Sequence, residues 1–526
     1  MTDTPEHTTS SVVPLAPRRD RPVAFIGFMG SGKTTAARAA ADALRAAPVD
    51  ADRVIEERRG KSIERIFAED GEAAFREAEE AATLELLEDP ANRVVSLGGG
   101  AIASERVRAA LAGHLVIWLD VDLDTAWARA SGSGRPLARD RAAFAALHAE
   151  REPLYTALAD AVVPAARSAV MGPVLDSLRG LPAGSQMLWA SSASGDYPVY
   201  LGAGLLLERR FWPLAIEGRR FLVTDGCVGH RYGDVVEPVA GCVTVTPGEQ
   251  SKTVAHAEIV WTELARAGMT RDDVVVALGG GVVGDLAGFC AATYQRGVRY
   301  VQVPTSLVAQ VDSAYGGKTG VDLAEAKNYV GAFHQPTAVI ADTSTLATLA
   351  PEEVAAGYAE VVKTALIAGG TLWERVRAGA DPTDPEVIMA CARTKLAVVA
   401  ADERDDGLRQ VLNLGHTVGH AIETVTGYAR YRHGEAVALG LLAALRLSGL
   451  NDLREEVASL LDAQALPTTL SEGDPDAILR ATTRDKKRRG EGPVPFVLLE
   501  APGEPRPGCV VDTDALTAAV RELVRS

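Results

Sequence analysis

The sequence predicts an α/β protein in which two parallel-sheet units precede a mostly α-helical unit. Over residues 22–180, and again over 197–350, short apolar runs such as "PVAFIGF" and "DDVVVAL" alternate with stretches of helical periodicity. This alternation is typical of parallel sheets covered by helices. Over 352–481 helical periodicity dominates, and only a late run, "VPFVLLE", indicates a further strand.

The same patterns divide the 526 residues into five segments, and a chain of this length can form several hydrophobic cores. A polar leader, expected to be disordered, is followed by the first α/β domain, a linker rich in Gly, Pro and Ser, the second α/β domain and the helical domain. The predicted boundaries are 1–20, 21–181, 182–196, 197–350 and 351–526.

The composition of the chain excludes some classes of ligand and indicates the cellular compartment. Lys and Arg number 54 and Asp and Glu 70, so the net charge is −16, which argues against a general nucleic-acid or anionic-membrane surface. The five cysteines form no CxxC pair and fit a reducing compartment. The leader lacks the apolar segment of a signal peptide, and the most apolar stretch, "AVALGLLAALRL", is too short to span a bilayer. We therefore expect a cytoplasmic protein that binds small molecules and has no nucleic-acid or membrane partner.

The clearest functional motif is a phosphate-binding loop near the start of the first domain. "GFMGSGKTT" contains Gly27-x-x-x-x-Gly32-Lys33-Thr34 between an apolar run and a helical stretch, which is the context this motif requires. Backbone N–H groups of such a loop bind phosphate oxygens, Lys33 reaches the β- and γ-phosphates, and the Thr34 hydroxyl holds Mg²⁺. The motif predicts nucleotide and Mg²⁺ binding but leaves the phosphoryl acceptor open.

Four charged residues bear on the acceptor. Asp50 and Asp52 can place a metal ion and accept hydrogen bonds from a polyol, although two exposed turn acids would have the same spacing. Arg76 lies among acidic residues and can either bind an anion or pair with its neighbours. Arg135 lies in "GSGRPL", a stretch of small residues suited to a closing lid.

Two glycine triplets, "SLGGGA" at 96–101 and "ALGGGV" at 277–282, each follow an apolar run. Only the first has a phosphate loop and a long acidic helical stretch ahead of it, so we predict two different sites rather than a repeat. At the second, Gly281, Gly284 and Asp285 can bring backbone and a carboxylate to a dinucleotide, although the stretch is not a GxGxxG motif. A packing turn between a strand and a helix explains the second triplet equally well.

The helical domain contains a candidate metal site. "NLGHTVGHAIE" places His416 and His420 four residues apart on one helical face, His433 follows in "HGEAV", and Glu360 lies in "AGYAEVVKTALI". Imidazoles with one carboxylate can form a Zn²⁺ site that keeps a coordination position open. The sequence contains neither HExxH nor a PCxxC partner, which argues against a metalloprotease or a zinc deaminase. Histidines that only pack between helices are the alternative.

Residues 21–181 resemble the shikimate kinase family. The stretches that carry the resemblance are "GFMGSGKTT", "DADRVIEERRGKSIERIFAEDGEAAFREAEE", "SLGGGA", "GRPL" and "REPLY", in this order. The resemblance implies a P-loop kinase fold and ATP-dependent phosphorylation of the shikimate 3-hydroxyl.

The resemblance also implies roles for individual residues of this domain. The implied catalytic residues are Lys33, Asp52 and Arg135, the last of which reaches from the lid towards the transferring phosphate. The implied shikimate contacts are Asp52, Arg76, Gly98, Gly99, Gly100 and Arg151, with both arginines on the carboxylate. The implied ATP contacts are Gly30, Ser31, Gly32, Lys33, Thr34, Thr35 and Arg129, and Thr34 and Asp50 hold Mg²⁺.

Residues 197–500 closely resemble the 3-dehydroquinate synthase family. The resemblance rests on "YPVYLGAGLL", "PGEQSK", "LGGGVVGDLAGF", "VPTSLVAQVDSAYGGKTGVD", "KNYVGAFHQP", "AGYAEVVKTALI" and "ADERDDGLRQVLNLGHTVGHAIE". It implies a Rossmann-like NAD-binding domain at 197–350 and a mostly helical domain for metal and substrate at 351–526. Bound NAD, a Zn²⁺ or Co²⁺ ion and a homodimer formed through this half are implied as well.

This second resemblance assigns three sets of residues. The implied metal ligands are Glu360, His416 and His433. The implied catalytic residues are Lys318, Lys363, Lys395, Arg409, Asn413 and His420, where His420 moves protons and does not bind the metal. The implied NAD contacts are Asp225, Glu249, Lys252, Gly281, Val282, Val283, Gly284, Asp285, Thr305, Ser306, Lys318, Lys327, Thr345 and Thr348. Further implied substrate contacts are Arg296, Asp312, Asn328 and one lysine of "DKK", Lys486 or Lys487.

The implied second reaction converts 3-deoxy-D-arabino-heptulosonate 7-phosphate into 3-dehydroquinate and phosphate. NAD removes a hydride from C5, phosphate leaves by β-elimination, the hydride returns and the ring closes, while the metal polarises the C5 oxygen. Together the two resemblances predict a bifunctional shikimate-pathway enzyme, a phosphotransferase fused to a lyase. Two alternatives stay open. The second half can be a related sugar-phosphate cyclase of secondary metabolism, of the aminodehydroquinate synthase type, or one half can be a degenerate binding or regulatory module.

Overall fold

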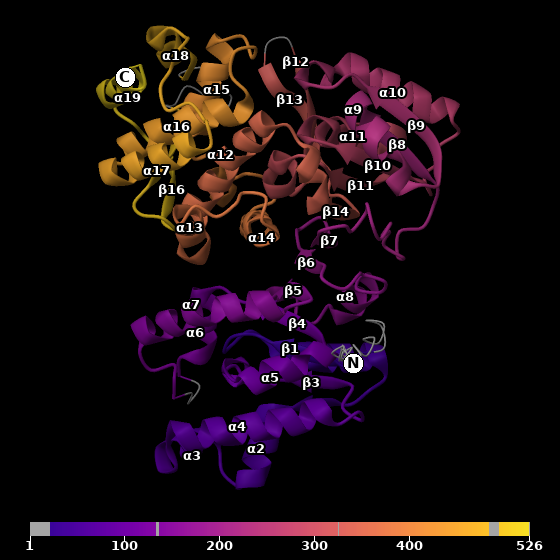
Figure 1. Cartoon of the computed structure of the whole chain (residues 1–526), viewed down its shortest axis with the longest axis vertical. Helices are drawn as coiled ribbons and strands as arrows, with labels where there is room; N and C mark the ends of the chain where they lie inside the picture. The colour runs from indigo at the N-terminus through magenta and orange to yellow at the C-terminus, as the bar shows by residue number, and fades with distance from the viewer. Residues whose placement is uncertain (1–20, 133–135, 324–325, 483–493, 525–526) are drawn as a thin grey trace, which may run out of the picture. The chain divides into compact units, whose positions relative to one another are not determined.

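A computed structural model describes residues 21–132, 136–323, 326–482 and 494–524 (Figure 1). The chain divides into two compact units, Met1–Ala183 and Gly184–Ser526. The second unit therefore contains both the second α/β domain and the helical domain predicted from the sequence. The predicted leader, together with Arg135, Lys486 and Lys487, lies outside the described residues.

The first unit contains a parallel sheet in the order β2-β3-β1-β4-β5. Its strands are β1 (Val23–Ile26), β2 (Pro48–Asp50), β3 (Val94–Ser96), β4 (Leu115–Asp120) and β5 (Ala161–Pro164). Its helices are α1 (Lys33–Leu44), α2 (Ala51–Arg59), α3 (Ile63–Glu69), α4 (Gly71–Glu88), α5 (Glu105–Ala110), α6 (Leu123–Ala130), α7 (Arg141–Leu158) and α8 (Met171–Ser177). All four residues of β1 are buried, as expected for a central strand covered on both faces. The parallel sheet predicted from the sequence is confirmed.

The second unit contains a sheet in the order β6-β7-β14-β11-β10-β8-β9. Its strands are β6 (Gln186–Ala190), β7 (Tyr197–Gly202), β8 (Arg220–Asp225), β9 (Val239–Val245), β10 (Val274–Gly279), β11 (Arg299–Pro304) and β14 (Ala338–Asp342). Strand β6 is antiparallel to β7, and the other neighbours are parallel. Strand β6 falls inside the segment that the sequence predicts to be a linker, so part of that segment belongs to the sheet.

The remaining elements of the second unit are mostly helical, and the helices that follow β14 form the orange and yellow part of Figure 1. The helices are α9 (Gly226–Tyr232), α10 (Val254–Arg266), α11 (Gly281–Thr293), α12 (Pro351–Ala368), α13 (Gly370–Arg377), α14 (Pro385–Ala401), α15 (His416–Val425), α16 (His433–Leu447), α17 (Asn451–Ala463), α18 (Pro475–Thr482) and α19 (Thr513–Glu522). Two small antiparallel sheets pair β12 (Lys318–Leu323) with β13 (Ala326–Phe333) and β15 (Phe496–Leu499) with β16 (Pro505–Cys509). Among the described helices, none has both the length and the apolar composition needed to cross a bilayer.

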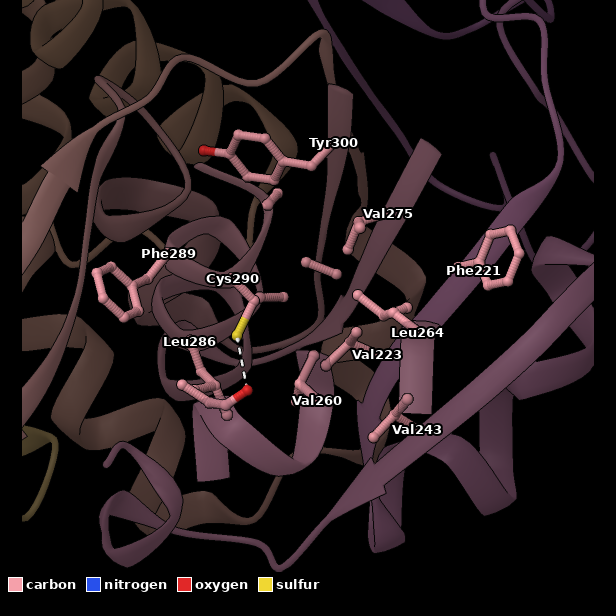
Figure 2. Close-up of a cluster of buried hydrophobic side chains, with 14 of the residues drawn as sticks. Phe221, Val223, Val243, Val260, Leu264, Val275, Leu286, Phe289, Cys290 and Tyr300 are labelled. Carbon is pink, nitrogen blue, oxygen red and sulfur yellow. Dashed lines mark hydrogen bonds between the residues drawn. The ribbon is translucent and has the colours of Figure 1, made fainter. Parts of the chain in front are cut away.

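A hydrophobic core packs helices α10 and α11 against one face of the second sheet (Figure 2). Phe221 and Val223 lie two residues apart on β8, so both side chains point to this face. Val260 contributes from α10, and Cys290, from α11, directs its sulfur towards the Ala257 carbonyl oxygen at 3.8 Å. This packing fixes the start of α11 beside the carboxyl ends of β8, β10 and β11, where parallel sheets usually bind ligands.

Close approach of helices in the helical part depends on glycines. A Cβ added at Gly440 of α16 would lie 2.0 Å from the carbonyl oxygen of Gly415, the residue that precedes α15. A Cβ added at Gly434 would lie 1.9 Å from the Ala356 carbonyl oxygen of α12. Both neighbours are backbone atoms, which cannot rotate away, so α12, α15 and α16 can approach this closely only without these side chains.

We expect Gly440→Ala to destabilise the second unit by about 1–3 kcal/mol, because the steric overlap outweighs the better helix propensity of alanine. Urea denaturation measures the change. Gly226→Ala is the matched control, since a Cβ there meets no atom within 4 Å. Equal stability of the two variants would show that α16 can shift to make room.

Candidate active sites

The phosphate loop connects β1 to α1 in the first unit. Gly27, Gly30 and Gly32 have positive φ values of 147°, 79° and 89°, which residues with a side chain rarely adopt. Lys33, the first residue of α1, donates from Nζ to the carbonyl oxygens of Gly27 at 2.7 Å and Phe28 at 3.0 Å. The amine thus lies over the loop, where it can meet a phosphate bound at the helix N-terminus.

A hydroxyl and a carboxylate meet beside this loop. Thr34 Oγ1 donates to Asp50 Oδ2 at 2.8 Å. Asp50 is the N-cap of α2, and its Oδ1 accepts from the Asp52 N–H at 3.1 Å. The structure therefore brings Thr34 and Asp50, the predicted Mg²⁺ residues, into contact and fixes Asp52 at the start of the next helix.

The first glycine triplet lies against charged side chains. A Cβ added at Gly98 would lie 2.3 Å from Glu79 Oε1 and 2.9 Å from Asp52 Oδ1, and one at Gly100 would lie 1.9 Å from Arg76 Nη1. The predicted shikimate residues Asp52 and Arg76 thus border the bare backbone that the triplet provides. Glu79, which the sequence analysis missed, is buried and pairs with Arg76 Nη1 at 2.6 Å.

Side chains from α7 and α6 also contact the first glycine triplet and the phosphate loop. Arg151 Nη1 donates to the Gly99 carbonyl oxygen at 2.9 Å, and the Tyr155 hydroxyl donates to the same oxygen at 2.8 Å. Burial raises the pKa of Tyr155, so its phenol keeps its proton and remains a donor. Arg129 Nη1 donates to the Gly30 carbonyl oxygen at 2.9 Å. Tyr155 was also missed, although it lies within the quoted "REPLY".

A large cleft, about 2190 Å³ in volume, lies in the second unit. Single small-molecule pockets are usually about 300–1,000 Å³ in volume, so this cleft has room for a dinucleotide and a substrate together. The predicted dinucleotide residues that line it are Asp225, Glu249, Lys252, Gly281, Val282, Val283, Asp285, Thr305, Ser306, Lys318, Lys327 and Thr348. The predicted substrate and metal residues that line it are Asp312, Asn328, Lys395, Asn413, His416, His420 and His433.

The second triplet forms the junction between β10 and α11. Gly279 ends the strand and Gly281 begins the helix. A Cβ at Gly281 would lie 2.9 Å from Ser313 Oγ, and one at Gly280 would lie 3.1 Å from Ser306 Oγ. No side chain caps α11, so its first N–H groups are available to an anion at the cleft wall.

Two lysines of the dinucleotide set are held by carboxylates. Lys252 is buried and its Nζ lies 2.5 Å from Asp285 Oδ2. Burial alone would lower the pKa of Lys252, but the carboxylates of Asp285 and Glu249 outweigh burial and raise the pKa. Lys327 Nζ lies 3.4 Å from Glu249 Oε1 and 3.2 Å from Glu423 Oε1. Both lysines are therefore charged and fixed in position at neutral pH.

The three predicted metal ligands come together from three helices. Glu360 lies on α12, while His416 and His433 are the first residues of α15 and α16. Glu360 Oε1 lies 3.5 Å from His416 Nε2 and 3.3 Å from His433 Nε2. All three ligand atoms lie within 4.8 Å of one another.

These residues fit a divalent cation. Glu360 is fully buried. Its Oε2 forms an ion pair with Lys363, and its Oε1, which faces the two imidazoles, has no hydrogen-bond partner. Burial would raise the pKa of Glu360, but Lys363 and His416 hold the pKa well below its usual range. His416 Nδ1 lies 3.2 Å from the Leu414 carbonyl oxygen, an arrangement that leaves Nε2 as the coordinating atom. A buried anion that faces two imidazole nitrogens is the donor set of an open zinc site.

Cationic side chains surround this position. Lys395 Nζ lies 2.8 Å from Asp312 Oδ1, while Lys363 lies between Asp312, at 3.8 Å, and Glu360. Burial would raise the pKa of Asp312, but Lys363 and Lys395 lower it to about 2. Burial lowers the pKa of Lys395 to about 8. Arg409 is buried and donates to the carbonyl oxygens of Glu403 at 2.6 Å and Gly316 at 2.9 Å.

Other predicted residues lie at the margin of the cleft or away from it. Lys318 Nζ lies 2.5 Å from Asp405 Oδ2, at the cleft wall. Thr345 is buried and donates to the Asp342 carbonyl oxygen at 2.7 Å, and Gly284 packs against Gln302 inside the α/β part. Arg296 is exposed and is not among the residues that line the cleft. Thr345, Gly284 and Arg296 are thus not among the residues that line the cleft.

Glu423 is a further residue near the metal position for which the sequence predicted no role. It lies on α15 seven residues after His416 and three after His420, on the same helical face. A second set of possible ligands, His420, Glu423 and His433, shares His433 with the first set. The final Glu of "NLGHTVGHAIE", at helical spacing from both histidines, was the available signal.

Comparisons with known proteins agree with this geometry. The family model of shikimate kinase matches residues 29–178, and those of the N-terminal and C-terminal domains of 3-dehydroquinate synthase match 242–356 and 357–488. A 3-dehydroquinate synthase from Halorhodospira halophila is 44% identical over 357 residues, which cover 64% of this chain and 99% of the relative.

Two solved structures share the fold of the second unit. A 2-deoxy-scyllo-inosose synthase complexed with carbaglucose-6-phosphate, NAD⁺ and Co²⁺ is 25% identical with a TM-score of 0.57, covering 64% of this chain and 100% of that chain. ValA, the 2-epi-5-epi-valiolone synthase from Streptomyces hygroscopicus subsp. jinggangensis 5008 with NAD⁺ and Zn²⁺ bound, is 25% identical with a TM-score of 0.57, covering 62% and 96%.

We expect Asp285→Asn to destabilise the second unit by roughly 3 kcal/mol, because it leaves the buried Lys252 without its closest counter-charge. Asp234→Asn is the control. It removes an exposed pair with Arg210 at 3.4 Å and should cost less than about 1 kcal/mol. Urea denaturation compares the two variants, and equal stabilities would mean that Glu249 alone neutralises Lys252.

Proposed function

The chain belongs to the 3-dehydroquinate synthase family and carries a shikimate kinase domain ahead of the synthase, and from this we propose how its two sites divide the chemistry. The first site transfers the γ-phosphoryl group of ATP to the 3-hydroxyl of shikimate. The second converts 3-deoxy-D-arabino-heptulosonate 7-phosphate into 3-dehydroquinate and phosphate. The observation that carries the proposal is that each unit brings charged side chains of its predicted site together beside a glycine triplet.

At the kinase site, the residues position two substrates and stabilise developing charge. The N–H groups of the phosphate loop and Lys33 would hold the β- and γ-phosphates, while Thr34 and Asp50 would hold Mg²⁺. Arg76 and Arg151 border the first triplet and offer planar guanidinium groups to a carboxylate. Asp52, next to Gly98, would accept a hydrogen bond from the hydroxyl that is phosphorylated.

At the synthase site, the residues would hold NAD⁺ and a divalent cation. The two similar solved structures contain NAD⁺ with Co²⁺ or with Zn²⁺, which supports both cofactors here. The start of α11 and Lys252 suit a pyrophosphate, and Glu360, His416 and His433 suit the cation. When bound, NAD⁺ would accept and return a hydride and the cation would polarise the neighbouring oxygen.

The chain's own residues then orient the substrate. Lys363 contacts Glu360, Lys395 contacts Asp312, and Arg409 adds positive charge near Lys395, so these three residues would hold the phosphate and carboxylate of the substrate. His420 lines the cleft with its ring centroid 5.2 Å from that of His416, and it would move a proton of the bound substrate. Asn413 lines the same cleft and would fix the orientation of a substrate hydroxyl.

Partners and compartment follow from the same chemistry. Small-molecule substrates suffice for both sites, and the net charge of −16 supports a protein without nucleic-acid or membrane partners. The five cysteines are unpaired, which supports the cytoplasm as the compartment. We also propose a homodimer formed through the synthase half, which sedimentation equilibrium would test.

Shikimate kinase and synthase assays on one preparation test the proposal. Lys33→Ala should lower shikimate phosphorylation by at least about a hundredfold, since it removes the cation at the transferring phosphate. The same variant should keep the wild-type rate of phosphate release from the heptulosonate, because Lys33 lies in the other unit. Lys61→Ala removes a cation that pairs with Glu69 and Asp70 outside the phosphate loop, and as the control it should keep both activities.

Loss of both activities in folded Lys33→Ala protein would contradict independent sites. The synthase assay uses the oxygen form of the heptulosonate, and its aminated analogue serves as the comparison. Turnover of only the aminated form would contradict the proposed substrate and assign the second half to secondary metabolism.

The synthase should also lose activity at alkaline pH. The pKa of Lys395 is lowered to about 8 by burial, so this lysine is charged below pH 8 and neutral above it. Because the charged form binds the anionic substrate, kcat/KM should fall with an apparent pKa near 8. Lys395→Arg should move this fall to higher pH, since a guanidinium stays protonated. An unchanged alkaline limb in the Lys395→Arg variant would show that another group titrates.

A further inference from the structure

Glu423 is a buried carboxylate that the reaction scheme leaves without a role. Its side chain is only 2% exposed, although it borders the cleft. Its two oxygens face different partners. Oε1 lies 3.2 Å from Lys327 Nζ, and Oε2 lies 3.5 Å from His433 Nδ1. One carboxylate thus touches both a predicted dinucleotide residue and a predicted metal ligand.

The His433 ring lies between two carboxylates. Its Nε2 is 3.3 Å from Glu360 Oε1, and its Nδ1 is 3.5 Å from Glu423 Oε2. An imidazole whose Nδ1–H is directed at a carboxylate presents the lone pair of Nε2, which is the form that binds a metal. His433 is the first residue of α16, and its side chain is 38% exposed. Packing alone therefore does not fix the orientation of the ring.

The Lys327 side chain is also held in position by contacts with acidic residues. It lies on β13, and its side chain is 24% exposed. Its ammonium contacts Glu249 on the α/β side of the cleft, at 3.4 Å, and lies 4.6 Å from the centre of the Tyr428 ring. Glu423 holds the same ammonium from the helical side. The lysine is therefore positioned by one acid from each part of the unit.

We propose that Glu423 is a positioning residue that orients His433 for the metal and Lys327 for the dinucleotide. The inference rests on the proposed synthase function, because it needs both a metal and a dinucleotide in the cleft. His416, His420 and Glu423 lie on one face of α15. This helix thus presents a metal ligand, a proton-transfer residue and the acid that orients His433.

Direct coordination by Glu423 is the competing role. His420, Glu423 and His433 also place ligand atoms within 4.8 Å of one another. The positioning role is favoured because Glu423 Oε1 is held by Lys327 and its Oε2 faces His433 Nδ1, whereas Glu360 Oε1 faces the Nε2 atoms of both imidazoles and has no hydrogen-bond partner. A metal therefore completes the surroundings of Glu360 and would have to displace the partners of Glu423.

The test compares full-length wild-type protein with Glu423→Gln, which keeps the shape of the side chain and removes its charge. Zn²⁺ affinity is measured by competition with a chromogenic chelator, and NAD⁺ affinity by calorimetry. We expect Zn²⁺ to bind about 10–100-fold more weakly, still with one ion at the site, because an outer carboxylate has been lost. NAD⁺ should bind roughly two- to tenfold more weakly, since Lys327 loses the charge of one of its two carboxylate partners.

Cobalt provides a readout that a purely structural role would not move. Co²⁺-loaded Glu423→Gln protein should show a shifted visible absorption band, because the orientation of His433 changes, while the far-UV circular dichroism of the metal-free protein stays that of wild type. Glu456→Gln is the matched control. It removes a pair with Arg377 at 2.5 Å outside the cleft and should change neither metal nor NAD⁺ binding.

Each outcome decides a different point. If wild-type protein binds Zn²⁺ no better than Glu360→Gln, the proposed metal site itself fails. If wild type binds Zn²⁺ and Glu423→Gln matches it in affinity and cobalt spectrum, the positioning of His433 is overturned. Complete loss of the ion, as in Glu360→Gln, would make Glu423 a ligand instead. Unchanged NAD⁺ affinity would overturn the role at Lys327. Should Glu423→Gln not fold, Glu423→Asp replaces it, with a smaller weakening expected.

Discussion

The helical part of the second unit is organised around the buried charge of Glu360. A carboxylate removed from water is costly unless cations compensate for it, and here Lys363 and two imidazoles provide the compensation. These partners come from three helices, so α12, α15 and α16 must approach closely at one point. The glycines at 434 and 440 permit this approach, because a side chain at either would overlap backbone. The packing of these helices and the compensation of the buried charge therefore both require the same close approach of α12, α15 and α16.

The two glycine triplets show that similar sequences can meet different physical demands. At Gly98 and Gly100 the space is taken by charged side chains, Glu79 and Arg76, which pair with each other at 2.6 Å. At Gly280 and Gly281 the space is limited by serine hydroxyls beside the start of a helix. The first triplet lets side chains approach the backbone, and the second lets a ligand approach the N–H groups of a helix. The sequence context, a phosphate loop in one case and none in the other, already separated them.

Sequence patterns within single segments predicted much of the fold and many of the candidate ligands. They did not predict contacts between residues that lie far apart in the chain. Alternating apolar and helical stretches predicted both parallel sheets, and Pro351 marked the start of α12. The spacing of His416, His420 and His433 indicated a metal site before any contact was known. Strand β6 lies in the segment that the sequence predicts to be a linker, because a strand of five residues is too short to show a clear periodicity. The roles of Glu79, Tyr155 and Glu423 depend on residues brought close only by the fold, and such pairings leave no mark in the spacing of one segment.

An acidic protein can bind anionic substrates because its cleft lysines are paired with acids in advance. Lys252 faces Asp285, Lys318 faces Asp405, and Lys327 faces Glu249 and Glu423. Each acid lowers the cost of burying an ammonium and restricts its rotamers, so the cation is positioned before a ligand arrives. At Lys318 and Lys395, burial and the nearby Arg409 outweigh the attraction of the paired acid and lower the pKa of both lysines, that of Lys395 to about 8. An anionic substrate bound beside Lys395 would raise the pKa of this lysine, so substrate binding should favour the protonated amine. The net charge of the chain thus says little about its sites, whose electrostatics are set by the acid placed beside each lysine.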